Sequence, residues 1–274
     1  MLVAFTTLLG YLLGLDSLES FSLYPVTGIF LLACGAAALN HFQERFTDSM
    51  MARTMHRPIP SGRISAVNGV LISLFFLILG STILLTNSNL TALGIGLYTF
   101  LWYNAVYTPL KRMTSFAIIP GSLVGALPPV AGWAAAGGDI LDPRILVLAA
   151  FFFVWQIPHF WILLMIYGKD YDKGGFPNLT NLFSISQLKK ITFSWIMLTA
   201  ATAMSFNFFQ IPGYAVTGIL ILAASVWLIY ESVLFMKSDN TNGNFKTMFI
   251  RINIFSLLII TILSSDKLIN LILA

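Results

Sequence analysis

The stretch Tyr24–Asp48, YPVTGIFLLACGAAALNHFQERFTD, joins an apolar run to three polar side chains at regular spacing. Residues 24–42 contain no Asp, Glu, Lys or Arg, and about 20 mostly apolar residues are enough to cross a bilayer as a helix. Asn40, Glu44 and Asp48 follow one another at intervals of four residues, which places them on one face of a continuous helix. The stretch therefore predicts a spanning helix whose end carries two carboxylates.

The composition of the whole chain also indicates a membrane protein. Its 274 residues include 15 basic and 11 acidic side chains, so 9% are charged, while 57% are hydrophobic and the mean hydropathy is +0.84. A soluble domain carries about 25% charged residues, so this composition excludes a soluble enzyme, and its hydrophobicity excludes a disordered chain. The single cysteine, Cys34, has no partner for an internal disulfide. We expect one membrane-embedded domain over residues 1–274.

Apolar runs bounded by charge, Pro or Gly predict nine transmembrane helices and hence an all-α, polytopic fold. The first run is short and lacks a basic flank, so it is not typical of a signal peptide. The predicted spans are Leu2–Leu15, Tyr24–Phe42, Ile64–Thr86, Leu90–Leu110, Thr114–Ala136, Ile145–Tyr167, Ile191–Phe209, Tyr214–Met236 and Met248–Ser264.

The basic residues predict the orientation. With nine spans, 13 of the 15 Lys and Arg residues fall in loops on one side, and only Arg144 and Lys267 fall on the other. Because cytoplasmic loops are enriched in Lys and Arg, we expect a multi-pass protein of the inner (cytoplasmic) membrane, with its N-terminus in the cytoplasm and its C-terminus outside. The basic residues are spread over four loops without a nucleic-acid-binding motif, so we expect no nucleic-acid partner.

The segment Met51–Arg63, MARTMHRPIPSGR, follows the carboxylates directly. Acidic groups at a helix end in a membrane protein are costly unless they are paired, hydrated or bound to metal, and Mg²⁺ takes one or two carboxylates together with substrate phosphates. We expect Pro58 and Pro60 to end the helix and to return Arg53 and Arg57 to the carboxylates, where guanidinium groups suit phosphate. The pattern predicts a Mg²⁺–diphosphate site. A hydrated loop whose basic residues only set the topology is the alternative.

Two further segments carry ionisable groups next to or inside predicted spans. Lys111 and Arg112, after Tyr107, are candidates for a second edge of the diphosphate site, or they only set the topology. His159 lies inside a predicted span, where an ionisable side chain is a functional candidate, although it could equally be a core histidine bonded to a backbone carbonyl. Pro128-Pro129 interrupts another span, which favours a widened cavity or a kinked packing helix.

A second polar loop, Tyr167–Leu179 (YGKDYDKGGFPNL), follows the sixth predicted span. It contains Lys169, Asp170, Tyr171 and Asp172. For Asp170 we expect one of three roles: binding metal through water, orienting Lys169 or holding the loop. For Asp172 a place on the surface is the better expectation.

Four motifs in order carry a family resemblance. Asn-x-x-x-Glu-x-x-x-Asp with Met-x-Arg-Thr-x-x-Arg-Pro-x-Pro-x-Gly-x-Ile covers residues 40–64, Tyr-Thr-x-x-Lys-Arg covers 107–112, Pro-His-Phe-Trp covers 158–161 and Lys-Asp-Tyr covers 169–171. Together they resemble the UbiA-type intramembrane prenyltransferases, and most of all their heme O synthase branch. Glu44 stands where many members have Asp, and a longer carboxylate still binds Mg²⁺. Other UbiA-type enzymes have aspartates four residues apart in the second loop, and this repeat is missing here.

The resemblance implies transfer of a farnesyl group from farnesyl diphosphate to a vinyl group of heme B, with addition of water, to give heme O for heme-copper terminal oxidases. It implies a helical bundle with a central cavity open to the cytoplasm, Mg²⁺ at the diphosphate, heme B as a substrate rather than a cofactor, and a heme A synthase or terminal-oxidase assembly protein as a partner. The implied catalytic residues are Asn40, Glu44, Asp48 and Asp170, with Glu44, Asp48 and Asp170 as metal ligands. The implied substrate-binding residues are Arg53, Arg57, Tyr107, Lys111, Arg112, His159, Lys169 and Tyr171.

Two alternatives to this function stay open. One is a UbiA-type prenyltransferase that acts on a quinone-precursor aromatic acid or on another tetrapyrrole, which the segments around His159 and Tyr171 disfavour. The other is a heme or ion transporter, which we would expect to carry ionisable groups near mid-span. Here the acidic groups cluster at the predicted cytoplasmic ends of the spans instead.

Overall fold

The computed structural model describes residues 2–273, and every regular element in that range is helical. Most of the apolar runs predicted from the sequence form single long helices, and the fourth and fifth are divided into shorter elements. The elements are α1 (Leu2–Gly14), α2 (Tyr24–Gln43), α3 (Arg45–Met50), α4 (Ala66–Asn87), α5 (Leu90–Leu101), a π-helical turn (Trp102–Tyr107), α6 (Thr108–Leu110), α7 (Ile118–Gly121), α8 (Leu123–Ala135), α9 (Pro143–Lys173), α10 (Ile185–Ser205), α11 (Ala215–Lys237) and α12 (Asn242–Leu273), with short 3₁₀ turns at Leu18–Ser20 and Leu179–Asn181.

Six of the helical segments are long and apolar enough to cross a membrane: α2, α4, the pair α7–α8, α9, α11 and α12. The other three predicted spans are helical but depart from this pattern. Helix α1 has 13 residues, the fourth span is divided by the π-helical turn, and α10 begins with the polar run SQLKK, residues 186–190. The count of nine spans therefore stays a prediction, although each predicted run is helical over most of its length.

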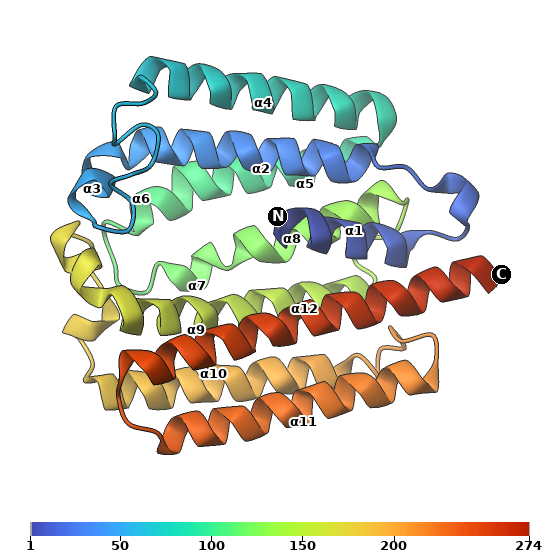
Figure 1. Cartoon of the computed structure of the whole chain (residues 1–274). Coiled ribbons are helices and arrows are strands. Elements are labelled where there is room, and N and C mark those ends of the chain that lie inside the picture. Colours follow the sequence, from blue (N-terminus) through green and yellow to red (C-terminus); the bar gives the residue numbers. More distant parts are fainter. Residues whose placement is uncertain (1, 274) are drawn as a thin grey trace.

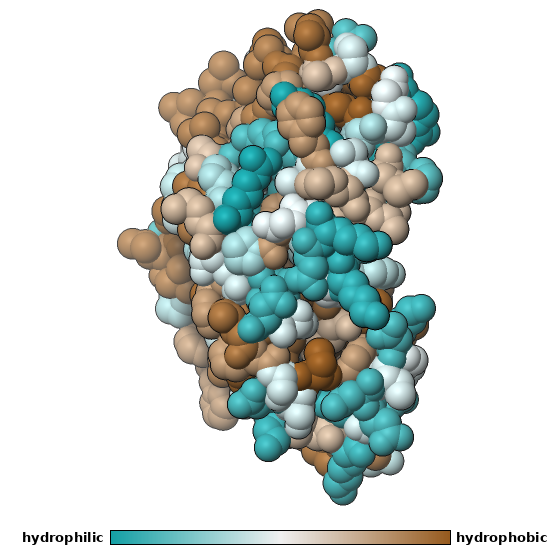
Figure 2. Space-filling view, turned by 90° about the vertical axis from the view of Figure 1, so that its left-hand side faces the viewer, coloured by the Kyte–Doolittle hydropathy of each residue, from teal (hydrophilic) through white to brown (hydrophobic). Residues whose placement is uncertain are grey.

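The long helices lie side by side, and the polar loops gather at one end of the bundle (Figure 1). Helix α3, the turn after α6, the loop after α9 and the connection from α11 to α12 all lie at that end, on the left of the view. Seen from that end, hydrophilic side chains cover much of the middle and lower part of the face, and apolar side chains gather at the top and along the left (Figure 2). The direction of the chain thus alternates as the basic residues predict, and the chain ends at the opposite face of the bundle (Figure 1).

Helix α1 reaches only part of the way through the bundle. At 1.5 Å per residue, its 13 residues extend about 20 Å, which is less than the hydrocarbon thickness of about 30 Å. It begins near the middle of the bundle beside α8 (Figure 1). The cytoplasmic location of the N-terminus therefore stays a prediction.

Small residues set the closest helix contacts. A Cβ atom added to Gly10 of α1 would lie 1.9 Å from the carbonyl oxygen of Pro129, and one added to Gly132 of α8 would lie 2.0 Å from that of Thr7. Glycine thus lets the two backbones touch, as is typical of helix contacts in lipid. Pro128 and Pro129 lie inside α8, and Pro128 also lines an apolar cavity of about 230 Å³. The pair thus lies inside a helix, and one of its two prolines borders a cavity.

Candidate active site

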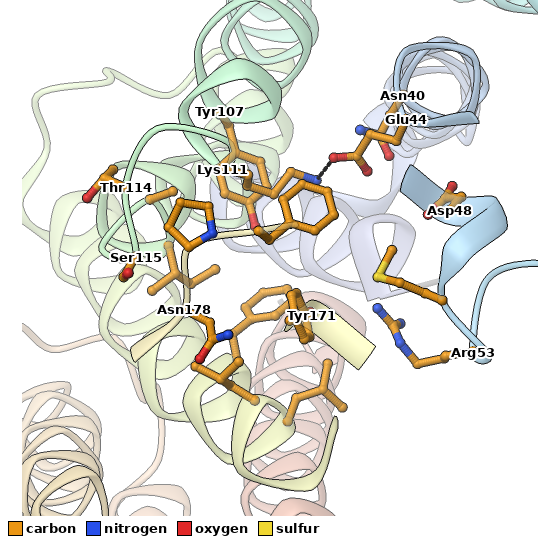
Figure 3. Close-up of a pocket in the computed structure, with 18 of the residues that line it drawn as sticks. Asn40, Glu44, Asp48, Arg53, Tyr107, Lys111, Thr114, Ser115, Tyr171 and Asn178 are labelled. Atoms are coloured by element: carbon orange, nitrogen blue, oxygen red, sulfur yellow. Dashed lines mark ion pairs between the residues drawn. The ribbon is translucent and has the colours of Figure 1, made fainter. Parts of the chain in front are cut away.

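A cavity of about 240 Å³ lies at the polar-loop end, between α2 and α3 on one side and the end of α9 on the other (Figure 3). We call it the main cavity. Eight of the predicted site residues line it: Asn40, Glu44, Asp48, Arg53, Arg57, Tyr107, Lys111 and Tyr171. Its other lining residues are Met51, Tyr103, Thr114, Ser115, Ala117, Ile118, Phe160, Trp161, Leu163, Leu164, Phe176, Pro177 and Asn178.

The three residues of the first motif share the cavity although the helix that carries them is broken. Helix α2 ends at Gln43, Glu44 adopts φ −97° and ψ 7°, and α3 then begins at Arg45. The four-residue register survives the break, because the Glu44 amide donates to the Asn40 carbonyl (2.9 Å) and the Asp48 amide donates to the Glu44 carbonyl (2.8 Å). The prediction of one continuous helix was therefore wrong in backbone geometry, but the shared face is confirmed.

The prediction that Pro58 and Pro60 end this helix was also wrong. Helix α3 ends at Met50, and Met51 has an extended backbone (φ −100°, ψ 127°). The prolines lie seven and nine residues later, in a loop of successive turns that leads to α4. The expected consequence nevertheless holds, because this loop brings Arg57 back to the carboxylates: its Nη1 lies 2.8 Å from Oδ2 of Asp48.

Each buried carboxylate of the first motif is paired with a cation. Asp48 is 1% exposed and pairs with Arg57, and Glu44 is 4% exposed and pairs with Lys111 at 2.6 Å between Oε1 and Nζ. Such pairing is expected, because an unpaired buried charge is strongly destabilising. Burial lowers the pKa of Lys111, and the Glu44 carboxylate opposes that shift. The cavity wall therefore holds two anions and two cations in compensated pairs.

The π-helical turn presents the aromatic wall of the cavity. It places Tyr103 and Tyr107 with ring centroids 5.8 Å apart, and Nζ of Lys111 lies 5.0 Å from the Tyr107 centroid. A Cβ atom on Gly121 would lie 2.4 Å from the Tyr107 ring, so glycine is needed there to admit the ring. Such π-turns are rare and are frequent at functional sites. Sequence reasoning missed this turn because no residue preference marks it.

Two successive hydrogen bonds hold the side-chain amide of Asn40 in place. Its Nδ2 donates to Oγ1 of Thr108 (3.0 Å), and that hydroxyl donates to the carbonyl of Tyr103 (2.9 Å). The first of these hydrogen bonds is buried and the second is partly buried. The contacts orient the Asn40 side chain so that its carbonyl oxygen is left for another partner, which is consistent with a supporting role beside the carboxylates.

The second polar loop contributes Tyr171 and Asn178 to the opposite wall (Figure 3). Helix α9 is kinked at Tyr167 (φ −119°, ψ 18°), and Tyr171 of the segment after the kink lines the cavity. Asn178, 3% exposed, is fixed by its Nδ2 donating to Asp172 (2.6 Å) and by its Oδ1 accepting from the Thr180 amide (3.0 Å). Sequence reasoning did not select Asn178. Its place after Phe-Pro in a loop matched to the family was the available signal.

Four predicted site residues do not line the main cavity. Arg112 instead donates from Nη2 to the Gln43 carbonyl (2.7 Å) at the end of α2. Lys169 and Asp170 line a separate cavity of about 350 Å³, where Lys169 is exposed. His159 packs among the rings of Trp155, Phe160 and Phe249, with centroids 4.8–5.0 Å away.

These placements bear on three expectations. Asp170 does not join Glu44 and Asp48 in one cluster, because its carboxylate accepts from the Arg53 amide instead, and residues 2–273 contain no group of three or more His, Cys, Asp or Glu side chains suited to a metal ion. Arg112 and Lys169 do not reach the cavity walls formed by Lys111 and Tyr171. His159 is a packed aromatic neighbour rather than a cavity residue.

The arrangement suits an apolar molecule with an anionic head. Carboxylate and amide oxygens of one wall adjoin Arg53, Arg57 and Lys111, while Ile118, Leu163 and Trp161 form an apolar part of the same cavity. Hard oxygen donors with basic groups beside them are the setting in which Mg²⁺ and phosphate bind together. The site therefore fits a metal-bound diphosphate attached to a hydrophobic chain.

Comparison with known proteins supports this interpretation. A model of the UbiA prenyltransferase family matches residues 3–253. A protoheme IX farnesyltransferase of Nitratidesulfovibrio vulgaris (strain Hildenborough) is 32% identical over 86% of this chain and 83% of the relative. A protoheme IX farnesyltransferase of Teredinibacter turnerae is 36% identical over 90% of this chain and 80% of the relative.

Solved structures show the same fold at low sequence identity. A structure of digeranylgeranylglyceryl phosphate synthase in membranes has a TM-score of 0.77 and 16% identity, covering 97% of this chain and 92% of that one. A UbiA homologue from Archaeoglobus fulgidus, bound to GPP and Mg²⁺, has a TM-score of 0.63 and 15% identity, covering 96% of each chain. The helical arrangement in Figure 1 is thus a fold that these solved membrane proteins also adopt.

Proposed function

The chain belongs to the UbiA prenyltransferase family, and from this premise we propose that it transfers a farnesyl group from farnesyl diphosphate to a vinyl group of heme B, giving heme O. The enzyme is a prenyltransferase, and its named relatives are protoheme IX farnesyltransferases. One observation carries the proposal: buried Glu44 and Asp48 share the main cavity with Arg53, Arg57 and Lys111. Heme B is a substrate in this reaction, not a cofactor.

Mg²⁺ fits the residues present. The first motif offers two buried carboxylates, of Glu44 and Asp48, and the amide oxygen of Asn40 in one cavity, and Mg²⁺ commonly takes one or two carboxylates and completes its shell with water and phosphate. When bound there, the ion would neutralise charge that develops on the departing diphosphate. Asp170 was expected as a third ligand, and its position outside the main cavity makes it a weaker candidate than the other two.

The residues of the chain itself account for the rest of the reaction. Arg53, Arg57 and Lys111 stabilise the diphosphate as the bond from its oxygen to C1 of the farnesyl chain breaks and the electron pair goes to that oxygen. The electron-rich vinyl group attacks C1, water adds to the new cation, and a proton is lost to leave the hydroxyl group. Aromatic faces such as those of Tyr107 and Trp161 attract the allylic cation. The apolar lining keeps bulk water from it.

The membrane arrangement is part of the proposal. We place nine helices across or within the inner (cytoplasmic) membrane, with the basic end and the mouth of the main cavity in the cytoplasm and the C-terminus outside. The 13-to-2 distribution of basic residues supports this orientation. Because heme O is a precursor for terminal oxidases, a heme A synthase or an oxidase assembly protein is the partner we expect to receive the product.

The test is a reconstituted reaction. Purified protein in lipid nanodiscs is incubated with heme B, farnesyl diphosphate and Mg²⁺, and heme O is identified by mass. We expect product from the wild type, none with EDTA, and at least a hundredfold less from Asp48→Ala. Replacing heme B by 4-hydroxybenzoate tests the aromatic-acid alternative. A wild-type protein that prenylates 4-hydroxybenzoate and leaves heme B unchanged would overturn the assignment.

A further inference from the structure

Asp170 connects the two polar loops that frame the main cavity. Its Oδ2 accepts a hydrogen bond from the backbone amide of Arg53 at 3.2 Å, across a separation of 117 residues. The two loops touch at a second point, since a Cβ atom on Gly174 would lie 3.1 Å from Sδ of the buried Met51. The end of α9 therefore holds the backbone of the segment that carries Arg53.

The same end of α9 also holds the Arg53 head group. The guanidinium carbon lies 5.8 Å from the ring centroid of Tyr167 and 5.9 Å from that of Tyr171, distances at which a cation is attracted to an aromatic face. The side chain points into the main cavity (Figure 3). Backbone and side chain of Arg53 are thus fixed by three residues within a five-residue stretch, residues 167–171.

Arg53 differs from the other cations of the cavity in its charge balance. Lys111 and Arg57 each lie within 2.8 Å of a carboxylate, whereas in residues 2–273 the guanidinium of Arg53 has no carboxylate within 4.0 Å. Asp170 contacts the amide of Arg53 and leaves its charge uncompensated. Among the three cavity cations, Arg53 is accordingly the one whose charge is available to an incoming anion.

We propose that Asp170 is a positioning residue, which holds the Arg53 loop so that the Arg53 guanidinium meets the diphosphate of the prenyl donor, and that it is not a metal ligand. This inference rests on the proposed function, because it concerns the same diphosphate. It also explains why the second loop carries Asp170 without the four-residue aspartate repeat expected of a second metal site. One carboxylate oxygen suffices to accept from one amide.

A conservative substitution of Asp170 distinguishes the positioning role from the role of metal ligand. A hydrogen-bond acceptor for a backbone amide needs only an oxygen, which Asn supplies as well as Asp, whereas Mg²⁺ favours the charged carboxylate. Asp170→Asn should therefore keep the loop in place, and Asp170→Ala should release it. If Asp170 bound the metal, both substitutions would impair the reaction and raise the Mg²⁺ requirement.

The experiment compares Asp170→Asn, Asp170→Ala, Arg53→Ala and the double variant Asp170→Ala/Arg53→Ala in nanodiscs. Heme O formation is measured against farnesyl diphosphate and against Mg²⁺. We expect Asp170→Asn to match the wild type and Asp170→Ala to lose roughly tenfold in kcat/KM for farnesyl diphosphate, the size of one hydrogen bond to a charged group. Asp170→Ala should have no further effect in the Arg53→Ala background, and the half-saturating Mg²⁺ concentration should not change in any of them. Asp239→Asn, an exposed acid of another polar loop, is the matched control.

The outcomes decide between the two roles. Loss of activity in Asp170→Asn together with a raised Mg²⁺ requirement would overturn the positioning role, as would full additivity of the Asp170 and Arg53 substitutions. Thermal unfolding of each variant in the same nanodiscs identifies one that has failed to fold, and Asp170→Asn, which keeps both size and acceptor, then decides. Failure of the proposed function itself is distinct, because it would appear as absence of heme O from the wild type.

Discussion

The Nζ of Lys111 lies 2.6 Å from Oε1 of Glu44, and this ion pair joins the end of α2 to the turn after α6 across the wall of the main cavity (Figure 3). The Glu44 side chain is 5% exposed and that of Lys111 is 20% exposed. Neither group would be stable in that position as an isolated charge, because removing one partner of a buried pair leaves the other without compensation. The contact between the two segments and the lining of the main cavity therefore depend on the same ion pair.

Lys111→Met should destabilise the protein. The Glu44 carboxylate would be left buried without its cation, which should lower the free energy of unfolding by about 3 kcal/mol. Adding Glu44→Gln should restore part of that loss, because the uncompensated charge is removed as well. Unfolding of the single and double variants in mixed micelles checks this, and a double variant less stable than Lys111→Met would contradict it.

The activity should fall at alkaline pH as Lys111 loses its proton. Burial lowers the pKa of Lys111 from the ordinary 10.5, with Glu44 opposing the shift, and in the proposed reaction the ammonium form is the one that stabilises the diphosphate. Lys111→Arg keeps its charge throughout, so its alkaline limb should lie at higher pH than that of the wild type. A pH–rate profile of heme O formation measures this. Coincident limbs in the two proteins would assign the titration to another group.

Deprotonation of Lys111, which should lower the activity, should raise the stability of the protein. Between the lowered pKa in the folded protein and the value of 10.5 in the unfolded chain, the unfolded state binds more protons than the folded one. In that window the contribution of Lys111 to the free energy of unfolding should rise with pH. Comparing the pH dependence of unfolding in the wild type and in Lys111→Met isolates the effect, and an identical slope in both would disprove it.

Gly132→Ala should separate α1 from α8. Its Cβ would lie 2.0 Å from the Thr7 carbonyl oxygen, a backbone atom that cannot turn aside, so a cost of about 1–3 kcal/mol is expected from overpacking. Gly94→Ala in α5 is the matched control, because a Cβ there meets nothing within 4 Å, and replacing glycine in a helix should be neutral or stabilising by up to about 1 kcal/mol. The midpoint of thermal unfolding should fall for Gly132→Ala, and it should stay the same or rise for Gly94→Ala.

Asp142→Ala should weaken the start of α9 without affecting the reaction. Asp142 is the N-cap of α9 and accepts from the Arg144 amide at 2.8 Å, so its loss should cost about 1 kcal/mol. The hydrogen bond from the Arg144 side chain is the main cause of the lowered pKa of Asp142. The contribution of the Asp142 carboxylate to the free energy of unfolding is therefore complete above its ordinary pKa of 3.8 and is lost as the pH falls through the lowered pKa of the folded protein. Heme O formation at neutral pH should be unchanged, because this cap is at the opposite end of the bundle from the main cavity.

Much of the fold could be predicted from the sequence, because scarcity of charge and length of apolar runs are properties of the chain itself. Every predicted span is helical over most of its length, and the basic loops gather at one end (Figure 1). The bounds were less accurate where helices leave the apolar layer: α12 extends to Leu273, nine residues past the predicted end. Hydropathy marks where lipid contact stops, whereas a helix continues as long as its hydrogen bonds are satisfied.

The sequence by itself determined that Asn40, Glu44 and Asp48 share one face, because a spacing of four residues survives even the break at Glu44. It also made Arg57 and Lys111 candidates for the same site, and the structure pairs them with Asp48 and Glu44. Only the tertiary structure decided where four other side chains lie, namely those of Asp170, Arg112, Lys169 and His159. Their neighbours come from segments distant in the sequence, and a hydrogen bond such as that between Asp170 and the Arg53 amide depends on how α9 bends at Tyr167, which no local pattern in the chain encodes.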